Sequence, residues 1–291
     1  RNREDGAVNG IPAGLNGIDD WIGGFKPGKL YTIAARPAMG KTGLIMTMVL
    51  NQAVRRGIPV GIFSLEMPDS ELYDRLVSQE AHVHGSKIQD TKLCSPDEYA
   101  RVLQAQEHVD IAPIQIDDTE GINIMELRSK AREMVKNGAK IIYIDYVQLA
   151  KADAGKNGNR TQEIGLITRS LKGMSKELQV PVIELAQLSR AVEQTHDKRP
   201  MLSHLKESSS IEEDSDVVMF IYRPEYYGIK GSDGSTLRGK AEIIIGKNRG
   251  GPTGTGELVF VDYLAQCRSY EETVDAEWIE DATPTLELPE S

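Results

Sequence analysis

The sequence predicts an α/β protein built on a mostly parallel, twisted sheet with helices on both faces. Short apolar runs of strand length alternate with longer helical patterns up to about residue 185. Turn residues such as Gly, Pro and Asn separate them. A Gly-Lys-Thr turn stands between the first apolar run and the first helical pattern. Strands and helices that alternate in this way form parallel sheets with crossover helices on both faces.

The expected elements follow in chain order. Strands are predicted over residues 30–34, 60–65, 114–116, 141–144 and 180–185. Helices are predicted over residues 15–21, 44–50, 69–82, 123–135 and 160–178, with a further helix starting at Ser95-Pro96. After residue 185 the pattern changes, because the apolar runs 216–222, 239–245 and 257–262 leave little room for helices. These runs predict further strands that end the sheet in an antiparallel edge hairpin.

Composition and length are those of a globular protein. The chain has 291 residues, of which 40% are hydrophobic and 27% are charged, which allows one large α/β domain or two small ones. Cys94 and Cys267 lie far apart without metal-ligand spacing, so we expect a reducing, cytoplasmic setting. No apolar run approaches the roughly 20 residues of a membrane span, and we expect no membrane partner. The start Arg1-Asn2-Arg3 has no signal-peptide pattern and suggests a fragment.

The net charge of −10 is concentrated near one end of the chain. Residues 271–291 hold eight acids and no base, so residues 1–270 carry 34 bases and 36 acids, a net charge of −2. We expect residues 271–291 to form a disordered acidic tail. The remainder is nearly neutral, which is compatible with a local basic path for a nucleic acid but does not demonstrate one.

The strand-turn-helix context of the Gly-Lys-Thr turn predicts a P-loop. Its residues are Ala35, Arg36, Pro37, Ala38, Met39, Gly40, Lys41 and Thr42. Main-chain N–H groups of such a turn hold phosphate oxygens, the lysine reaches the β- and γ-phosphates, and the threonine hydroxyl binds Mg²⁺. We therefore expect ATP and Mg²⁺ as ligands. The P-loop pattern begins with glycine, whereas this chain has Ala35. A methyl group is tolerated there only if the backbone does not need positive φ.

Three more polar residues end apolar strands and are expected to meet the P-loop. Asp145 ends the strand 141–144, Glu66 follows the strand 60–65, and Gln187 follows the strand 180–185. In a parallel sheet, ligands bind at the carboxyl ends of the strands. Asp145 is then suited to orient Mg²⁺, Glu66 to polarise an attacking water, and Gln187 to contact the γ-phosphate. The alternatives are an ordinary strand-end aspartate and a simple surface glutamate.

Lys247 and Arg249 require a separate explanation. They alternate in Gly246-Lys247-Asn248-Arg249-Gly250, which places both on one face of a strand end. Such a pair is able to reach across a subunit boundary toward a neighbour's nucleotide, as an arginine finger does. Solvated cations at a hairpin are the alternative.

Eight motifs in order give the chain a specific resemblance. They are Ala35 to Thr42, Phe63-Ser64-Leu65-Glu66-Met67, residues 144–149, Gln187-Leu188-Ser189-Arg190, Lys198-Arg199-Pro200, Lys206-Glu207-Ser208, residues 211–214 and residues 246–252. Over about residues 8–270 the chain resembles the C-terminal motor domain of replicative DNA helicases of the DnaB family. The family's P-loop also accepts a small residue in place of its first glycine.

The resemblance implies a RecA-like P-loop NTPase and a homohexameric ring around single-stranded DNA, with ATP between subunits. It implies that Lys41 and Thr42 bind phosphate and magnesium, that Asp145 is the Walker B acid, and that Glu66 is the catalytic base. It makes Gln187 the γ-phosphate sensor and Lys247 and Arg249 the cations given in trans. It assigns the DNA grip to a loop formed by Lys206, Glu207, Ser208, Ser209 and Ser210. The family usually has Arg at position 206 and Gly at 209; Lys206 keeps the charge but loses a bidentate fork.

The resemblance also implies an organisation and partners. Residues 1–29 form an entry segment, residues 30–270 the motor domain, and residues 271–291 the acidic tail. The family's N-terminal helical domain, which docks primase, lies outside this chain, and primase and a helicase loader are expected partners. The implied function is ATP-dependent 5′-to-3′ translocation on single-stranded DNA at the replication fork. Two alternatives remain open, namely a RecA-like ATPase that does not unwind DNA and a nucleotide-dependent regulator.

Overall fold

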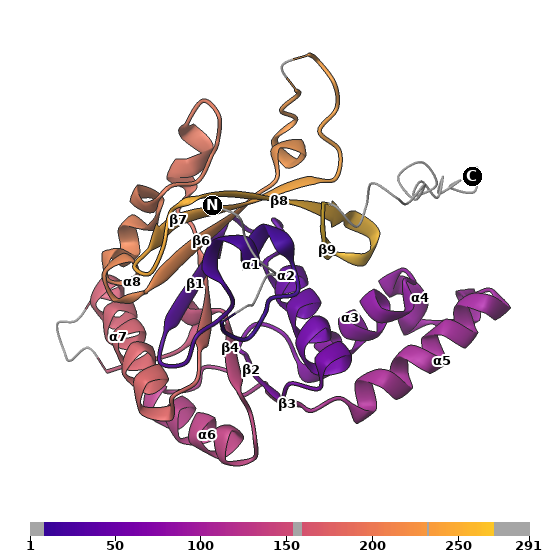
Figure 1. Cartoon of the computed structure of the whole chain (residues 1–291), viewed down its shortest axis with the longest axis horizontal. Helices are drawn as coiled ribbons and strands as arrows, with labels where there is room; N and C mark the ends of the chain where they lie inside the picture. Colours follow the sequence, from indigo (N-terminus) through magenta and orange to yellow (C-terminus); the bar gives the residue numbers. More distant parts are fainter. Residues whose placement is uncertain (1–8, 154–158, 232, 271–291) are drawn as a thin grey trace.

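The computed structural model describes residues 9–153, 159–231 and 233–270, without the side chains of residues 206–209. Its centre is a nine-stranded sheet in the order β3-β2-β4-β5-β1-β6-β7-β8-β9 (Figure 1). The predicted acidic tail, residues 271–291, lies outside the described residues. No helix in the described ranges is both long and apolar enough to cross a membrane.

Six parallel strands make up the first part of the sheet. They are β1 (Leu30–Ala35), β2 (Val60–Ser64), β3 (Ile114–Asp117), β4 (Ile141–Asp145), β5 (Val182–Gln187) and β6 (Val217–Tyr222). The central strands are apolar at nearly every position because helices cover both of their faces. The predicted parallel sheet is confirmed.

Helices cover the two faces of the sheet and produce two apolar cores (Figure 1). One core contains residues of α1 (Asn16–Ile22), α2 (Lys41–Val49), α3 (Asp69–Ala81), α4 (Gly85–Gln89) and α5 (Pro96–Ile111). The other contains residues of α6 (Ile124–Lys136), α7 (Arg160–Leu178) and α8 (Ser209–Asp214). The predicted coverage of both faces is therefore correct, while α4 was not expected.

The remaining edge is antiparallel, as predicted, but larger than a hairpin. It consists of β7 (Lys240–Asn248), β8 (Gly254–Val261) and β9 (Gln266–Ser269). Strand β9 was missed because Gln266-Cys267-Arg268-Ser269 has no apolar run. Its pairing with β8 brings the turn at Ala265 against α2, where a Cβ atom on Gly43 would lie 2.0 Å from the Ala265 carbonyl oxygen.

Helix starts follow the local sequence signals. Ser95 caps α5 in a capping box with Glu98, and the Asn123 side chain accepts a hydrogen bond from the Met125 N–H at the start of α6. Asp69 is the first residue of α3 rather than its cap, because Pro68 occupies the cap position.

The segment expected to be a DNA-binding loop is helical instead. A 3₁₀ helix spans Leu202–Ser208 and leads directly into α8. The side chains of residues 206–209 lie outside the described part of the structure. The predicted loop conformation of Lys206 to Ser210 is therefore wrong, while its predicted role stays untested.

Candidate functional site

The turn between β1 and α2 has the backbone of a P-loop. Ala35 lies inside β1 and is extended, so its methyl group is tolerated in place of glycine. Gly40 has a φ of 89°, and a Cβ atom on it would lie 2.4 Å from the Phe260 ring. Glycine is thus required at position 40 by both conformation and space. Ala38 also has positive φ, at 62°, which completes the sharp reversal into the helix.

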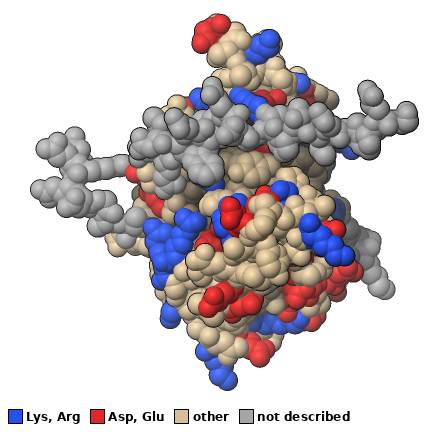
Figure 2. Space-filling model, turned by 90° about the vertical axis from the view of Figure 1, so that its right-hand side faces the viewer, with Lys and Arg blue, Asp and Glu red and all other residues tan. Residues whose placement is uncertain are grey.

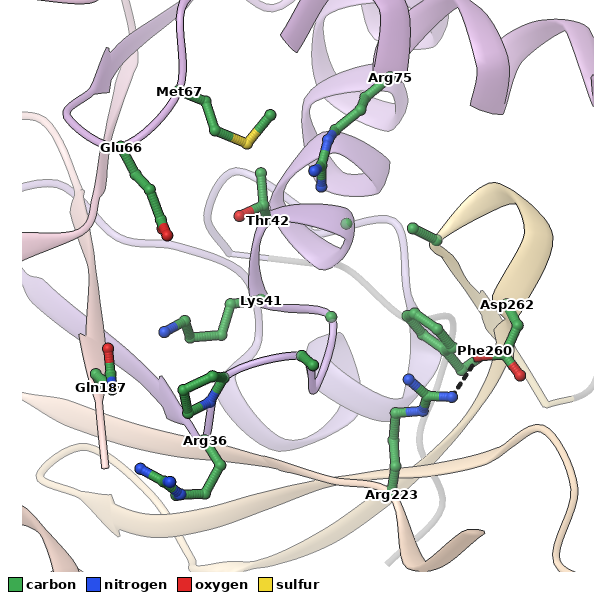
Figure 3. Close-up of a pocket in the computed structure, with 15 residues that line it drawn as sticks. Arg36, Lys41, Thr42, Glu66, Met67, Arg75, Gln187, Arg223, Phe260 and Asp262 are labelled. Atoms are coloured by element: carbon green, nitrogen blue, oxygen red, sulfur yellow. Dashed lines mark hydrogen bonds and ion pairs between the residues drawn. The ribbon is translucent and has the colours of Figure 1, made fainter. Parts of the chain in front are cut away.

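A cavity of about 420 Å³ opens over this turn, and we call it the P-loop cavity (Figure 3). Its lining includes Arg36, Pro37, Ala38, Gly40, Lys41, Thr42, Glu66 and Gln187. Of the predicted P-loop residues, Ala35 and Met39 are buried and do not line it. In Figure 3 the side chains of Lys41, Glu66 and Gln187 point toward one another on one side of the turn. The three strand-end predictions thus converge on one space.

Thr42 and Asp145 form the polar floor beside this cavity. The Thr42 hydroxyl donates a hydrogen bond to Asp145 Oδ2 at 2.7 Å. Asp145 is buried, and its Oδ1 has no hydrogen-bond partner among the described residues. Burial raises the pKa of Asp145, and the Thr42 hydrogen bond and the Lys41 charge partly oppose this rise. A divalent cation next to Oδ1 would satisfy this atom and favour the ionised carboxylate.

The Asp145 oxygens are suited to Mg²⁺ but are insufficient to bind it alone. Within the described residues, no cluster of three or more His, Cys, Asp or Glu side chains has the geometry to hold a metal ion. Mg²⁺ is usually held by one or two protein oxygens together with substrate phosphates and water. Thr42 and Asp145 fit that pattern.

Lys41 provides a positive charge that is already partly withdrawn from water. Burial lowers its pKa, and the carboxylates of Asp145 and Glu66 oppose this shift. Its Nζ lies 5.2 Å from the centroid of the Tyr146 ring. An ammonium group in this position attracts an anionic ligand strongly, because little solvent screens it.

Glu66 is fixed in place through its neighbours in the turn after β2. The Leu65 N–H donates to the Asp145 carbonyl oxygen at 2.7 Å, and the Ser64 hydroxyl donates to the Met67 carbonyl oxygen at 2.5 Å. These contacts tie the turn to β4. The Glu66 carboxylate is thereby directed toward Lys41 (Figure 3).

The opposite wall of the cavity contains residues that sequence reasoning missed. Arg223 forms an ion pair with Asp262, and its guanidinium carbon lies 3.8 Å from the centroid of the Phe260 ring (Figure 3). Arg75 from α3 also lines the cavity. Arg223 directly follows β6, so the rule that ligands bind at strand carboxyl ends would have found it. No comparable signal marks Arg75 or Phe260.

Lys247 and Arg249 lie outside the P-loop cavity of their own chain. Lys247 Nζ donates to the main-chain carbonyl oxygens of Glu212 and Glu213, and Arg249 donates to that of Glu213. Both side chains thus reach the same end of α8, which confirms that they share a face. Burial is the main cause that lowers the pKa of Lys247, followed by the Arg249 charge.

Charges of both signs are distributed over the surface. Figure 2 shows Lys and Arg side chains interspersed with Asp and Glu side chains on the side of the molecule that lies at the right in Figure 1. This mixture agrees with the net charge of −2 over residues 1–270. A polyanion would therefore depend on a local group of cations.

Comparison with known proteins gives consistent matches. A family model described as the DnaB-like helicase C-terminal domain matches residues 10–269. The chain is 41% identical over 261 residues to the replicative DNA helicase DnaB of Geobacillus stearothermophilus, covering 89% of this chain and 56% of that protein. It is 40% identical over 257 residues to the replicative DNA helicase DnaC of Bacillus subtilis (strain 168), with coverages of 88% and 56%. The chain thus spans just over half the length of these curated relatives.

Solved structures match in the same region. The ATPase domain of G40P superimposes with a TM-score of 0.84 at 36% identity, covering 91% of this chain and 93% of that one. A DnaB-like replicative helicase, described with its interactions with primase, gives the same TM-score and identity and covers 91% and 63%. The RadB recombinase, at 12% identity and a TM-score of 0.54, shares the fold alone.

Proposed function

Because this chain belongs to the family of DnaB-like helicase C-terminal domains, we propose that it is the ATP-driven motor of a replicative DNA helicase. The motor moves 5′ to 3′ on single-stranded DNA. The observation that carries this proposal is the convergence of Lys41, Glu66 and Gln187 on one cavity, next to the hydrogen-bonded pair Thr42 and Asp145. A regulator with little hydrolysis would not need a carboxylate directed at the phosphate site.

ATP binds with its phosphates on the P-loop. The N–H groups of the turn and of the α2 N-terminus hold phosphate oxygens, and Lys41 contacts the β- and γ-phosphates. The base and ribose lie toward Phe260 and Arg223, whose stacked side chains form the far wall of the cavity. An aromatic ring and a guanidinium plane accept a flat base on their faces.

Mg²⁺ fits between Thr42, Asp145 and the phosphates, where it neutralises charge that develops on the transferred phosphoryl group. Glu66 accepts a proton from the attacking water, and its position near Lys41 keeps it ionised for that role. Gln187 donates its amide N–H to the γ-phosphate and loses this contact after hydrolysis. Each of these side chains stands on a different strand end, so the sheet sets their spacing.

The site is completed by a second copy of the chain. Arg249 and Lys247 lie outside their own P-loop cavity, so in a homohexameric ring they reach the nucleotide of the neighbour. An arginine placed in this way stabilises the transition state by roughly 10³-fold or more in rate. Lys206, Glu207, Ser208, Ser209 and Ser210 face the DNA in the ring and contact its phosphates.

Residues 30–270 act as the motor, residues 1–29 as its entry segment, and residues 271–291 as an acidic tail. Primase and a loader are proposed partners of the longer helicase, since a structure with 36% identity to this chain is described with its interactions with primase. The setting is the cytoplasm, in agreement with the unpaired Cys94 and Cys267.

ATP turnover of three variants tests this proposal. Glu66→Gln keeps the shape of the side chain but removes the base, so ATP should still bind while turnover falls by ~10²-fold or more. Lys41→Ala should weaken binding as well. Arg249→Ala alone should be inactive, and mixing it with Lys41→Ala should restore some turnover, because an intact Arg249 then meets an intact P-loop.

Fluorescent-nucleotide binding and steady-state hydrolysis measure these outcomes. Parental turnover by Glu66→Gln would refute the assignment of the base. Mixed rings that regain no activity at any ratio would refute the contribution in trans.

A further inference from the structure

The side-chain amide of Gln148 is paired with the main chain of Gln187. Gln148 Nε2 donates to the Gln187 carbonyl oxygen at 3.4 Å, and the Gln187 N–H donates to Gln148 Oε1 at 3.3 Å. Gln148 lies in the 3₁₀ turn Val147–Leu149 that follows β4. Its amide therefore contacts both polar groups of one residue at the end of β5.

This pair replaces a strand partner that is missing at that point. Strands β4 and β5 pair only as far as Ile144 and Glu184, whereas β1 continues beside β5 as far as Ala35, opposite Gln187. The Leu188 N–H is satisfied on the β1 side by the Ala35 carbonyl oxygen at 3.0 Å. The Gln187 main chain faces the other side, where the Gln148 amide extends the ladder by one side chain.

Gln187 also stands between two cavities. The second cavity, of about 450 Å³, shares Arg36 and Gln187 with the P-loop cavity and is also lined by Gln148, Ser189 and His204. The Ser189 N–H donates to the His204 carbonyl oxygen at 3.3 Å. His204 lies in the 3₁₀ helix Leu202–Ser208, so a movement of Gln187 is transmitted through Ser189 to this helix.

Gln148 is itself held from the far side. The Arg160 guanidinium at the start of α7 donates to the Gln148 carbonyl oxygen and forms an ion pair with Glu163. The Glu163 carboxylate in turn accepts the Ala152 N–H at 3.0 Å. The Gln148 amide is thus anchored by its own backbone and does not depend on Gln187 for its position.

We infer that Gln148 is a positioning residue, which holds the Gln187 main chain so that the Gln187 side chain stays directed at the γ-phosphate. This inference rests on the proposed function. If the amide is removed, the Gln187 peptide loses both partners on the β4 side. ATP still binds through the P-loop, but the contact to the γ-phosphate and its link to the 3₁₀ helix are no longer maintained.

A double-mutant cycle tests the inference. Gln148→Ala should lower kcat for DNA-stimulated ATP hydrolysis by roughly tenfold, the loss expected for two modest hydrogen bonds. Binding of a fluorescent ATP analogue should stay within about twofold, because the P-loop is untouched. In a Gln187→Ala background the same substitution should cost nothing more, since residues that act as a unit are non-additive.

Two further variants make the test specific. Gln148→Glu keeps the acceptor for the Gln187 N–H but loses the donor, so it should recover part of kcat. Gln115→Ala is a matched control, because the Gln115 amide also donates to a main-chain oxygen, that of Met134 at 3.2 Å, on the far edge strand β3. It should leave kcat and nucleotide binding at parental values.

A Gln148→Ala protein with parental kcat would overturn the inference, as would costs that multiply in the double variant. A Gln148→Ala protein that does not fold would overturn it as well, if Gln148→Glu then also failed to recover kcat. Failure of the proposed function is separate, since it would appear as parental turnover by Glu66→Gln. An inactive Glu66→Gln next to a fully active Gln148→Ala would refute this inference alone.

Discussion

Glu184 is a fully buried carboxyl group in the central strand β5. The Thr32 hydroxyl donates to its Oε1 at 2.8 Å, and its Oε2 has no hydrogen-bond partner in the described part of the chain. Burial, and to a smaller extent the nearby Asp214, raises the pKa of Glu184 to about 8, against the opposing Thr32 hydrogen bond. The folded protein therefore holds this side chain in its neutral form near neutral pH.

The pKa of Glu184 predicts a stability that decreases as pH rises. Between the ordinary pKa of 4.5 and about 8, the folded state binds a proton that the unfolded chain has released. The free energy of unfolding should then fall with pH, by at most about 1.4 kcal/mol per pH unit. Glu184→Gln cannot lose a proton, so its stability relative to the parent should improve steadily across this window.

Urea denaturation of both proteins at several pH values from about 5 to about 8 measures this difference. Parallel profiles for parent and Glu184→Gln would contradict the prediction, because they would mean that Glu184 titrates alike in both states.

Single residues at the site differ in how far the sequence could predict them. Lys41, Thr42, Asp145, Glu66 and Gln187 were found because each follows an apolar strand, and parallel strands bring their carboxyl ends to one edge. Phe260 and Arg75 could not be found in this way. They reach the cavity through the packing of the antiparallel edge and of α3, which strand order alone does not determine.

At the scale of elements, α1 and β8 meet through glycines. A Cβ atom on Gly256 would lie 1.8 Å from the Gly17 carbonyl oxygen, and one on Gly254 would lie 2.1 Å from the Trp21 ring. The backbone of α1 is thus in direct contact with β8. This contact fixes the antiparallel edge, including Phe260, relative to the N-terminal part of the fold.

Gly256→Ala should separate these two elements. The clash involves main-chain atoms that cannot move aside alone, so a loss of roughly 2–4 kcal/mol in the free energy of unfolding is expected. Gly173→Ala is the matched control, since Gly173 lies exposed in α7 with nothing within 4 Å of its Cβ position. That substitution should stabilise the protein by roughly 0.5–1 kcal/mol.

Denaturation midpoints with unchanged m-values report both effects. A Gly256→Ala protein as stable as the parent would show that α1 is not held against β8.

Elements with strong local patterns were predicted well, and those formed by tertiary pairing were not. The parallel strands and helices α5, α6 and α7 follow apolar periodicity and caps. Strand β9 exists because β8 provides a partner, and the helical form of residues 202–208 arises from packing that a polar sequence does not reveal. In both cases tertiary context overrides local propensity.

At the scale of the whole molecule, nucleotide, neighbour and DNA are linked by position. The P-loop cavity lies at the carboxyl ends of β1, β2, β4 and β5, whereas Arg249 lies beside α8 and outside this cavity. The 3₁₀ helix with Lys206 runs directly into α8. A change at the nucleotide is thus close both to the subunit boundary and to the proposed DNA contact.

ATP turnover measured against the concentration of poly-dT tests the central claim most directly. The account predicts that turnover of the parent protein rises with poly-dT and saturates. Lys206→Ala should need more poly-dT for the same rate and should lose about 0.7 from the salt slope of binding for each contact in the ring, whereas Lys92→Ala, an exposed lysine near α5, should behave like the parent. Turnover that stays flat at every poly-dT concentration would contradict the claim that this chain is a motor on single-stranded DNA.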